Sequence, residues 1–122
     1  MKLQQVKEIL QAEVVYGWEW EEREVWHACG ADLMSDVLAF TKDKTLLITG
    51  LSHIQVVRTA DVSDMTAIVF VRGKRPSSEM IELAQSKDIP LLVADVSMYE
   101  ACGLLYQTGL RGCSSRPVAN HG

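Results

Sequence analysis

The sequence predicts an α/β fold in which a layered parallel or mixed sheet is flanked by helices. Residues 45–49, 65–71 and 90–94 are short apolar runs rich in Val, Ile and Leu, a pattern typical of strands buried on both faces. A stretch with helical spacing of apolar residues follows each run, and repeated strand–helix units imply right-handed crossovers. The 122 residues are 48% hydrophobic and 23% charged, with a mean hydropathy of +0.04, which suits one globular domain.

The first 44 residues are less regular. Residues 3–10 have apolar side chains spaced for a short amphipathic helix, and residues 13–16 and 24–29 are expected to be strands. Residues 32–40 begin with an acid and carry an apolar stripe, which predicts another helix.

Each of the three later helices has a serine where it is expected to begin. These N-cap candidates are Ser52, Ser77 or Ser78, and Ser97. Gln55 and Glu100 follow the first and last of them at the spacing of a capping box. Beyond residue 110 the chain offers nothing to pack, so we expect one domain over residues 1–110 and a flexible tail over residues 111–122.

Charge and cysteine content narrow the classes of function. The net charge is −4, and residues 13–24 account for all of it, since five acids there face one arginine. No basic stripe is left for a phosphate backbone, so we expect no nucleic-acid binding. No apolar run approaches the ~18 residues that span a bilayer, and no signal peptide is evident. Three cysteines without disulfide or metal spacing favour a cytoplasmic protein without membrane contact.

Motifs of common enzymes are absent from the sequence. It contains no G-x-x-x-x-G-K-[ST], G-x-G-x-x-G, G-x-S-x-G or H-E-x-x-H pattern. We therefore expect a protein without catalytic activity and without a cofactor.

Polar residues follow the predicted parallel strands, at the end where open sheets bind ligands. Helix N termini at this edge favour anions, and Arg72, Lys74 and Arg75 add positive charge. This predicts a site for a small anion or a nucleotide phosphate, whereas the alternative is a solvated basic turn. The candidate ligand-binding residues are Thr49, Gly50, Gln55, Arg58, Arg72, Asp95 and Ser97.

His27 and Cys29 are the one close His/Cys pair in the sequence. On a strand they share a face, so a metal-binding protein or an enzyme centred on them, with His53, Cys102 or Asp95, is an alternative. The other interpretation is a buried free cysteine beside a hydrogen-bonded histidine.

Trp18, Trp20 and Trp26 lie within nine residues and are separated by acids. Alternation predicts that Trp18 and Trp20 lie on one side of an extended edge. They could form a lid over the core, a self-association surface in a homodimer, or the docking surface of an adaptor for another protein.

A longer pattern extends over residues 22–110. It includes Thr49, Gly50 and Leu51, then residues 55–56, 58–60, 67–73, Pro76, 89–92, 98–103 and 105–106, with residues 32–39 upstream. This pattern resembles the DRTGG domain family. Where the family motif reads Asp-Arg, two residues, then Thr-Gly-Gly, this chain has Glu22 and Arg23, then Trp26, His27 and Ala28. Both glycines, and the positive φ they allow, are therefore lost.

The resemblance implies a fold similar to the N-terminal domain of HPr kinase/phosphorylase and of Mur ligases. It also implies a regulatory or dimerising role beside catalytic or CBS modules, without chemistry of its own. Our hypothesis is a non-catalytic regulatory domain that self-associates and senses a small anionic or nucleotide-like metabolite.

Overall fold

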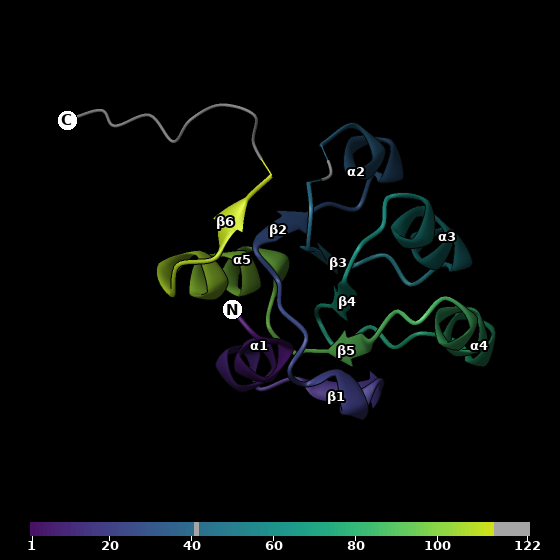
Figure 1. Ribbon diagram of the computed structural model, residues 1–122, viewed down its shortest axis with the longest axis horizontal. Helices are drawn as coiled ribbons and strands as arrows, with labels where there is room; N and C mark the ends of the chain where they lie inside the picture. Colours follow the sequence, from purple (N-terminus) through teal and green to yellow (C-terminus); the bar gives the residue numbers. More distant parts are fainter. Residues whose placement is uncertain (41, 114–122) are drawn as a thin grey trace.

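A six-stranded sheet lies between two layers of helices (Figure 1). The structure is a computed structural model that describes residues 1–40 and 42–113, with Trp18 and Phe40 by backbone alone. The elements are α1 (Leu3–Leu10), β1 (Glu13–Tyr16), η1 (Trp18–Trp20), β2 (His27–Gly30), α2 (Met34–Phe40), β3 (Thr45–Thr49), α3 (Ile54–Val62), β4 (Ala67–Phe70), α4 (Ser78–Ser86), β5 (Leu91–Val93), α5 (Met98–Gln107) and β6 (Arg111–Gly112). No helix within these ranges has the length and apolar character needed to cross a membrane.

The sheet is mixed, which confirms the predicted fold class. Its strand order is β1-β5-β4-β3-β2-β6, and β2 to β6 run parallel to one another. Only β1 is antiparallel, and it closes the edge beside β5. The three central strands have the unbroken apolar character of strands that are covered on both sides.

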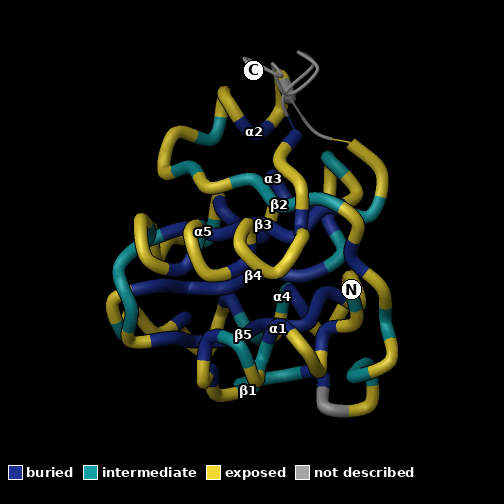
Figure 2. The backbone as a smooth tube through the Cα atoms, turned by 90° about the vertical axis from the view of Figure 1, so that its left-hand side faces the viewer, coloured by how far each residue is buried: buried dark blue, intermediate teal, exposed yellow. Residues whose placement is uncertain are grey.

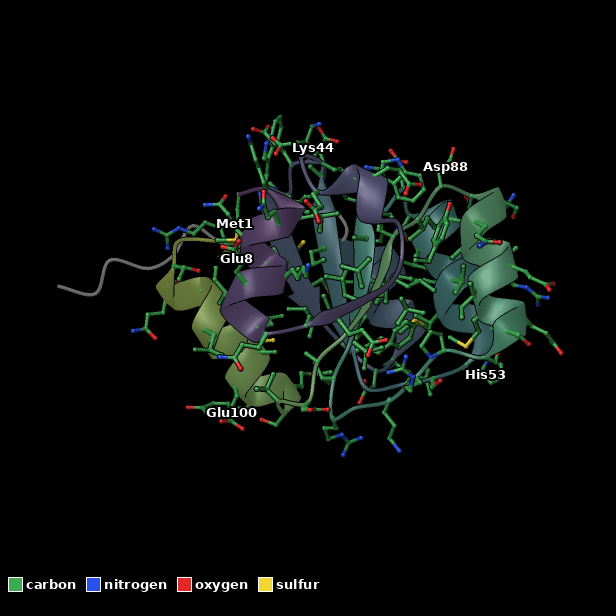
Figure 3. All side chains as sticks on the ribbon, turned by 90° about the horizontal axis from the view of Figure 1, so that it is seen from below. Met1, Glu8, Lys44, His53, Asp88 and Glu100 are labelled. Carbon is green, nitrogen blue, oxygen red and sulfur yellow. The ribbon has the colours of Figure 1, made fainter. Side chains whose placement is uncertain are left out.

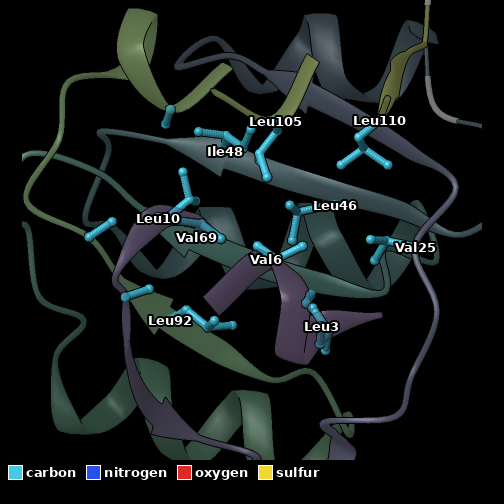
Figure 4. Packing of buried hydrophobic residues seen from close by; sticks show 14 of the residues in the cluster. Leu3, Val6, Leu10, Val25, Leu46, Ile48, Val69, Leu92, Leu105 and Leu110 are labelled. Carbon is cyan, nitrogen blue, oxygen red and sulfur yellow. The ribbon is translucent and has the colours of Figure 1, made fainter. Parts of the chain in front are cut away.

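Alternate residues of the central strands divide the core into two clusters. Leu46, Ile48 and Val69 face α1 and α5 (Figure 4). Leu47 and Phe70, which alternate with these residues along β3 and β4, face α2, α3 and α4. Figure 2 shows the buried strands inside and the exposed helix surfaces outside. The apolar runs found in the sequence are therefore strands that pack against a helical layer on each face of the sheet.

The strands are shorter or shifted relative to the predicted ranges. The runs at 65–71 and 90–94 contribute only Ala67–Phe70 and Leu91–Val93 to the strands. The segment predicted as a strand from residue 24 joins the sheet only at His27. Before that, Glu24 forms a bridge with Lys2 and Val25 N donates to Met1 O, so this segment first pairs with the N terminus of the chain.

Two local predictions were wrong. His53, not Ser52, caps α3, because its Nδ1 accepts a hydrogen bond from Gln55 N at 3.1 Å while Ser52 Oγ donates to Arg75 O. The segment from Trp18 to Trp20 is a 3₁₀ helix and not an extended edge. It follows Gly17, whose φ of 103° turns the chain where a Cβ would lie 2.8 Å from Pro90 Cβ. Ser77 and Ser97 cap α4 and α5, as the sequence predicts.

Ordered structure continues beyond residue 110. Arg111 and Gly112 form β6, which pairs in parallel with His27 and Ala28 of β2. Cys113 is buried, with its Sγ 3.5 Å from Thr45 Oγ1. The first part of the expected tail is therefore an edge strand, and residues 114–122 lie outside the described residues.

Replacing Phe70 by alanine should destabilise the protein by about 3–5 kcal/mol, because it empties the centre of a cluster in which this side chain is fully buried. The free energy of unfolding, measured with urea, tests this. Val62→Ala is the control, since that side chain is 76% exposed and its loss should change stability by less than about 0.5 kcal/mol. Equal effects of the two variants would contradict the core assignment.

Candidate functional site

The connections that leave the carboxyl ends of β4 and β5 go to opposite faces of the sheet. β4 leads into α4, which covers one face, and β5 leads into α5, which covers the other (Figure 1). In open α/β sheets, such a switch between neighbouring strands is where ligands bind. The residues at this switch are Arg72, Gly73 and Lys74 after β4, and Asp95, Val96 and Ser97 after β5.

Hydrogen bonds join the two loops directly. Arg72 N donates to Val96 O at 2.8 Å, and Gly73 N donates to Ala94 O at 2.9 Å. Both donors belong to residues in the left-handed region, with φ of 55° at Arg72 and 65° at Gly73. A left-handed arginine costs about 1–2 kcal/mol, which the bonds to the neighbouring loop help to offset. The backbone here is therefore held in one conformation.

This turn directs the Arg72 side chain toward the end of β3. A Cβ placed on Gly50 would lie 3.2 Å from Arg72 Nη2, so glycine at this position leaves room for the guanidinium over the backbone. Arg72 is exposed, and none of its guanidinium nitrogens makes a hydrogen bond or an ion pair within the described residues. A free arginine side chain thus lies at the switch.

Asp32, at the end of β2, binds the end of β3. Its Oδ1 accepts hydrogen bonds from Thr49 Oγ1 at 3.0 Å and from Gly50 N at 2.8 Å. Thr49 Oγ1 in turn accepts from Leu51 N at 3.2 Å. The amides of Gly50 and Leu51 at this strand end are therefore already engaged, and positive side chains supply the attraction for an anion.

Lys74 and Arg75 differ in their availability. Arg75 Nη1 and Nη2 donate to Glu13 Oε1 and Oε2 at 3.2 and 2.7 Å, a bidentate pair that links the loop after β4 to β1. The hydrogen bond from Arg75, followed by its charge, lowers the pKa of Glu13 below its ordinary value of 4.5. Lys74 is exposed and makes no ion pair with any residue in the described ranges. Arg72 and Lys74 are therefore the available cations.

The predicted ligand-binding residues fall into three groups. Thr49, Gly50 and Arg72 lie together at the ends of β3 and β4. Asp95 reaches the same turn, since its Oδ1 lies 3.1 Å from where a Cβ on Gly73 would be, and Ser97 caps α5 just beyond. Gln55 and Arg58 are exposed on α3, and no hydrogen bond or ion pair joins their side chains to the other candidates within the described residues.

Asp32 is an addition to the candidate residues, and Lys74, which the sequence analysis named for its charge, joins them. Asp32 was recognised in the sequence only as the acid that precedes a helix, because its partners Thr49 and Gly50 lie far along the chain. The sequence did contain a signal for Asp32, since an acid shortly after a predicted strand lies at the same edge of the sheet as the other strand ends.

His27 and Cys29 do not gain further metal ligands from the described part of the chain. There, no three His, Cys, Asp or Glu side chains come together, and His27 Nδ1 lies 3.0 Å from Asp43 O. Burial, and then the neighbouring Cys113 and Cys102, raise the pKa of the Cys29 thiol, while burial raises that of Cys102. Raised thiol pKa values disfavour the thiolate that binds metals and attacks electrophiles.

The tryptophans make separate contacts inside the chain. Trp20 packs edge-to-face on Tyr16, with ring centroids 5.2 Å apart, and the Arg23 Cζ lies 4.6 Å from the Trp20 ring centroid. Trp26 is 47% exposed and lies under Lys44 Nζ at 5.2 Å. The side chain of Trp18 is outside the described part of the structure. Trp20 is therefore part of the packing between η1 and β1.

The retained arginine of the family motif lies at the other end of the sheet. Arg23 Nη1 donates to Asp88 O at 2.9 Å and Thr66 O at 3.3 Å, just before β5 and β4 begin. Figure 3 shows Asp88 and Lys44 at this amino edge, and His53 and Glu100 at the opposite edge. His27 and Ala28, which replace the motif glycines, lie in β2 paired with Thr45 and Leu46, where no positive φ is needed.

Comparisons with known proteins agree with this fold. The family model described as DRTGG domain matches residues 5–108. A crystal structure of the CBS and DRTGG domains of the regulatory region of Clostridium perfringens pyrophosphatase, complexed with the activator diadenosine tetraphosphate, matches with a TM-score of 0.73 and 22% identity. The match covers 88% of this chain and 46% of that chain, and at this identity it establishes the fold. The comparison with curated proteins gave no match.

The Glu13–Arg75 pair should make stability depend on acidity. Because the pKa of Glu13 is lower in the folded chain than its ordinary 4.5, the pair stabilises the fold at higher pH and loses its effect as pH falls through the folded pKa. We expect the melting temperature of Glu13→Gln to decline less on acidification below pH 4.5 than that of the unmodified chain. Glu8→Gln, at an exposed residue of α1, is the control, and equal acid dependence in all three proteins would contradict the role of the pair.

Proposed function

The chain belongs to the DRTGG domain family, and we propose that it is a non-catalytic regulatory domain that binds a small anionic or nucleotide-like ligand at the carboxyl ends of β4 and β5. The Arg72 guanidinium carries this proposal, because it lies exposed at the switch between the faces and has no partner among the described residues. An arginine held ready by a fixed backbone can donate two parallel hydrogen bonds to a phosphate.

The neighbouring groups suit the rest of such a ligand. Lys74 adds a second positive charge, and the N terminus of α5 beyond Ser97 adds a partial positive charge. Asp95 is exposed on the same turn, where a carboxylate can accept hydrogen bonds from ribose hydroxyls. The proposed site therefore contains Thr49, Gly50, Arg72, Asp95 and Ser97, with Gln55 and Arg58 at its border on α3.

The ligand class is proposed from chemistry and from the structural relative together. The regulatory region of the pyrophosphatase is complexed with diadenosine tetraphosphate, which joins four phosphates to two nucleosides. We extend only the class, an anionic nucleotide, to this chain. A ligand at the switch would touch the loops that lead into α4 and α5, so it could bias the positions of helices on both faces.

Regulation without bond cleavage fits the side chains at the site. The Asp32 carboxylate accepts two hydrogen bonds from β3 and its following turn, and Ser97 Oγ donates to Glu100 Oε1 at 3.1 Å while capping α5. These hydrogen bonds hold the end of β3 and the N terminus of α5, so we assign the two side chains to structure and to binding rather than to nucleophilic attack. The proposal includes self-association as a homodimer, which is what the resemblance to the DRTGG family implies.

Thermal unfolding of the full chain tests the proposal. With inorganic phosphate, pyrophosphate and diadenosine tetraphosphate as separate probes, we expect at least one to raise the melting temperature. At about 100 times the Kd, the added stability should be about 2.7 kcal/mol. Arg72→Ala should remove most of this shift, because it deletes the free guanidinium. Lys42→Ala, which removes an exposed cation just before β3 at the opposite edge of the sheet, is the control that should retain it.

Two results would contradict this function. The first is the absence of a shift with all three probes, or a shift that is unchanged in Arg72→Ala. The second concerns catalysis: chromatography of the probe after incubation should return it intact, and hydrolysed product would overturn the non-catalytic assignment. Comparing phosphate with the dinucleotide shows whether the nucleoside contributes.

A further inference from the structure

Asp32 follows β2 at the carboxyl edge of the sheet, and only one of its two carboxylate oxygens is engaged. Its Oδ1 accepts both hydrogen bonds from the end of β3, whereas its Oδ2 accepts none within the described residues. The residue is exposed, and its carboxylate forms no ion pair in the same part of the chain. Asp32 therefore keeps an uncompensated negative charge beside the proposed ligand site.

The Arg72 guanidinium lies near this carboxylate without binding it. A Cβ on Gly50 would lie 3.2 Å from Arg72 Nη2, 3.7 Å from Arg72 Nε and 3.6 Å from Asp32 Oδ1. Both charged groups therefore border the space above this glycine, although no ion pair joins them among the residues that the structure describes. A phosphate that binds Arg72 from this space has Asp32 as its neighbour.

The charges around the proposed ligand site cancel. Arg72 and Lys74 contribute two positive charges. Asp32 and Asp95 contribute two negative charges, and none of these four side chains makes an ion pair within residues 1–40 and 42–113. Arg75 is already neutralised by its ion pair. Pyrophosphate and nucleotides carry several negative charges, and like charges at close range repel one another. The chain by itself therefore does not neutralise such a ligand.

A metal ion at Asp32 must take most of its ligands from outside the chain. In the described residues, no three His, Cys, Asp or Glu side chains come together. Asp32 and Asp95 follow β2 and β5, with β3 and β4 between them, and neighbouring strands are about 4.8 Å apart, so one ion cannot contact both. Mg²⁺ suits such a place, because it binds through one or two carboxylates and the phosphates of a ligand while it keeps several waters.

We propose that the ligand binds as its Mg²⁺ complex, with Asp32 Oδ2 coordinating the ion and the Arg72 guanidinium donating to a phosphate oxygen. This inference rests on the proposed function, and it names the form in which the ligand binds. The ion adds two positive charges and turns Asp32 from a group that repels phosphate into one that attracts it. Asp95 lies on the other side of the Arg72 backbone and stays available for hydroxyl groups of the ligand. The site thus distinguishes a magnesium phosphate complex from the free anion.

Isothermal titration calorimetry of the full chain, with pyrophosphate and diadenosine tetraphosphate as probes, tests the metal. Each probe is titrated in excess MgCl₂ and again in EDTA, and MgCl₂ is also titrated alone. We expect binding with Mg²⁺ to be tighter by about tenfold or more. MgCl₂ alone should show no saturable binding, because the chain supplies a single carboxylate to the ion. Equal affinity in the two media, or saturable binding of the ion without a phosphate, would overturn the proposal.

Asp32→Asn tests whether this carboxylate holds the ion. The amide oxygen of asparagine can still accept from Thr49 and Gly50, so the end of β3 stays in place while the negative charge is lost. In MgCl₂ the variant should bind both probes about tenfold or more weakly than the unmodified chain. In EDTA it should bind them a few-fold more tightly, because the repulsion of the phosphates is removed. Asp43→Asn, at an exposed acid just before β3, is the matched control and should change neither affinity.

A weakening of Asp32→Asn that is equal in both media, or a response to Mg²⁺ like that of the unmodified chain, would overturn the role of Asp32. Mn²⁺ provides a second measurement without a substitution, since carboxylate and phosphate oxygens bind it as they bind Mg²⁺. With pyrophosphate present, this paramagnetic ion should broaden the ¹H–¹⁵N signals of Asp32 and Gly50 and leave that of Thr66, at the opposite edge, unchanged. Broadening centred elsewhere would contradict the assignment.

The outcomes separate this inference from the proposed function on which it rests. Failure of both probes to bind in either medium would overturn the ligand site and the magnesium complex together. Binding that is equally tight with and without Mg²⁺, and that is lost in Arg72→Ala, would overturn the magnesium complex and leave the proposed function standing.

Discussion

The parallel pairing of β4 with β5, followed by helices on opposite faces, is the constraint on which the rest of the structure depends. Each strand is buried on both sides, so α4 and α5 must cover different layers. Where the two helices diverge, the loops after the strands remain at the surface. The same divergence leaves α5 on the far side of the sheet, where Tyr99 and Tyr106 are exposed.

Backbone hydrogen bonds make this switch rigid. The bonds from Arg72 N to Val96 O and from Gly73 N to Ala94 O fix two successive left-handed residues, and that turn places the guanidinium over Gly50. Asp32 holds the end of β3 in the same way from the other side. A cation that is already oriented loses less conformational entropy when an anion binds, so the fixed backbone contributes to affinity without touching the ligand.

Local patterns in the sequence predicted the central strands, the mixed layered fold and two of the three helix caps, because these depend on neighbouring residues. Contacts between residues far apart in the sequence could not be predicted from such local patterns. Glu13 binds Arg75 from 62 residues away, which removes one of three apparent anion-binding cations. Asp32 engages the amide of Gly50 from 18 residues away. The 3₁₀ turn at Trp18–Trp20 depends on Gly17 fitting against Pro90, a contact that strand alternation does not encode.

Chemical-shift mapping by two-dimensional ¹H–¹⁵N NMR, during titration of the full chain with diadenosine tetraphosphate, tests the central claim most directly. The account predicts saturable shifts concentrated at Gly50, Arg72, Gly73 and Ser97, with little change near Arg23 at the opposite edge of the sheet. Shifts that cluster around Arg23 and Thr66, or a spectrum that does not change, would contradict a ligand site at the switch between β4 and β5.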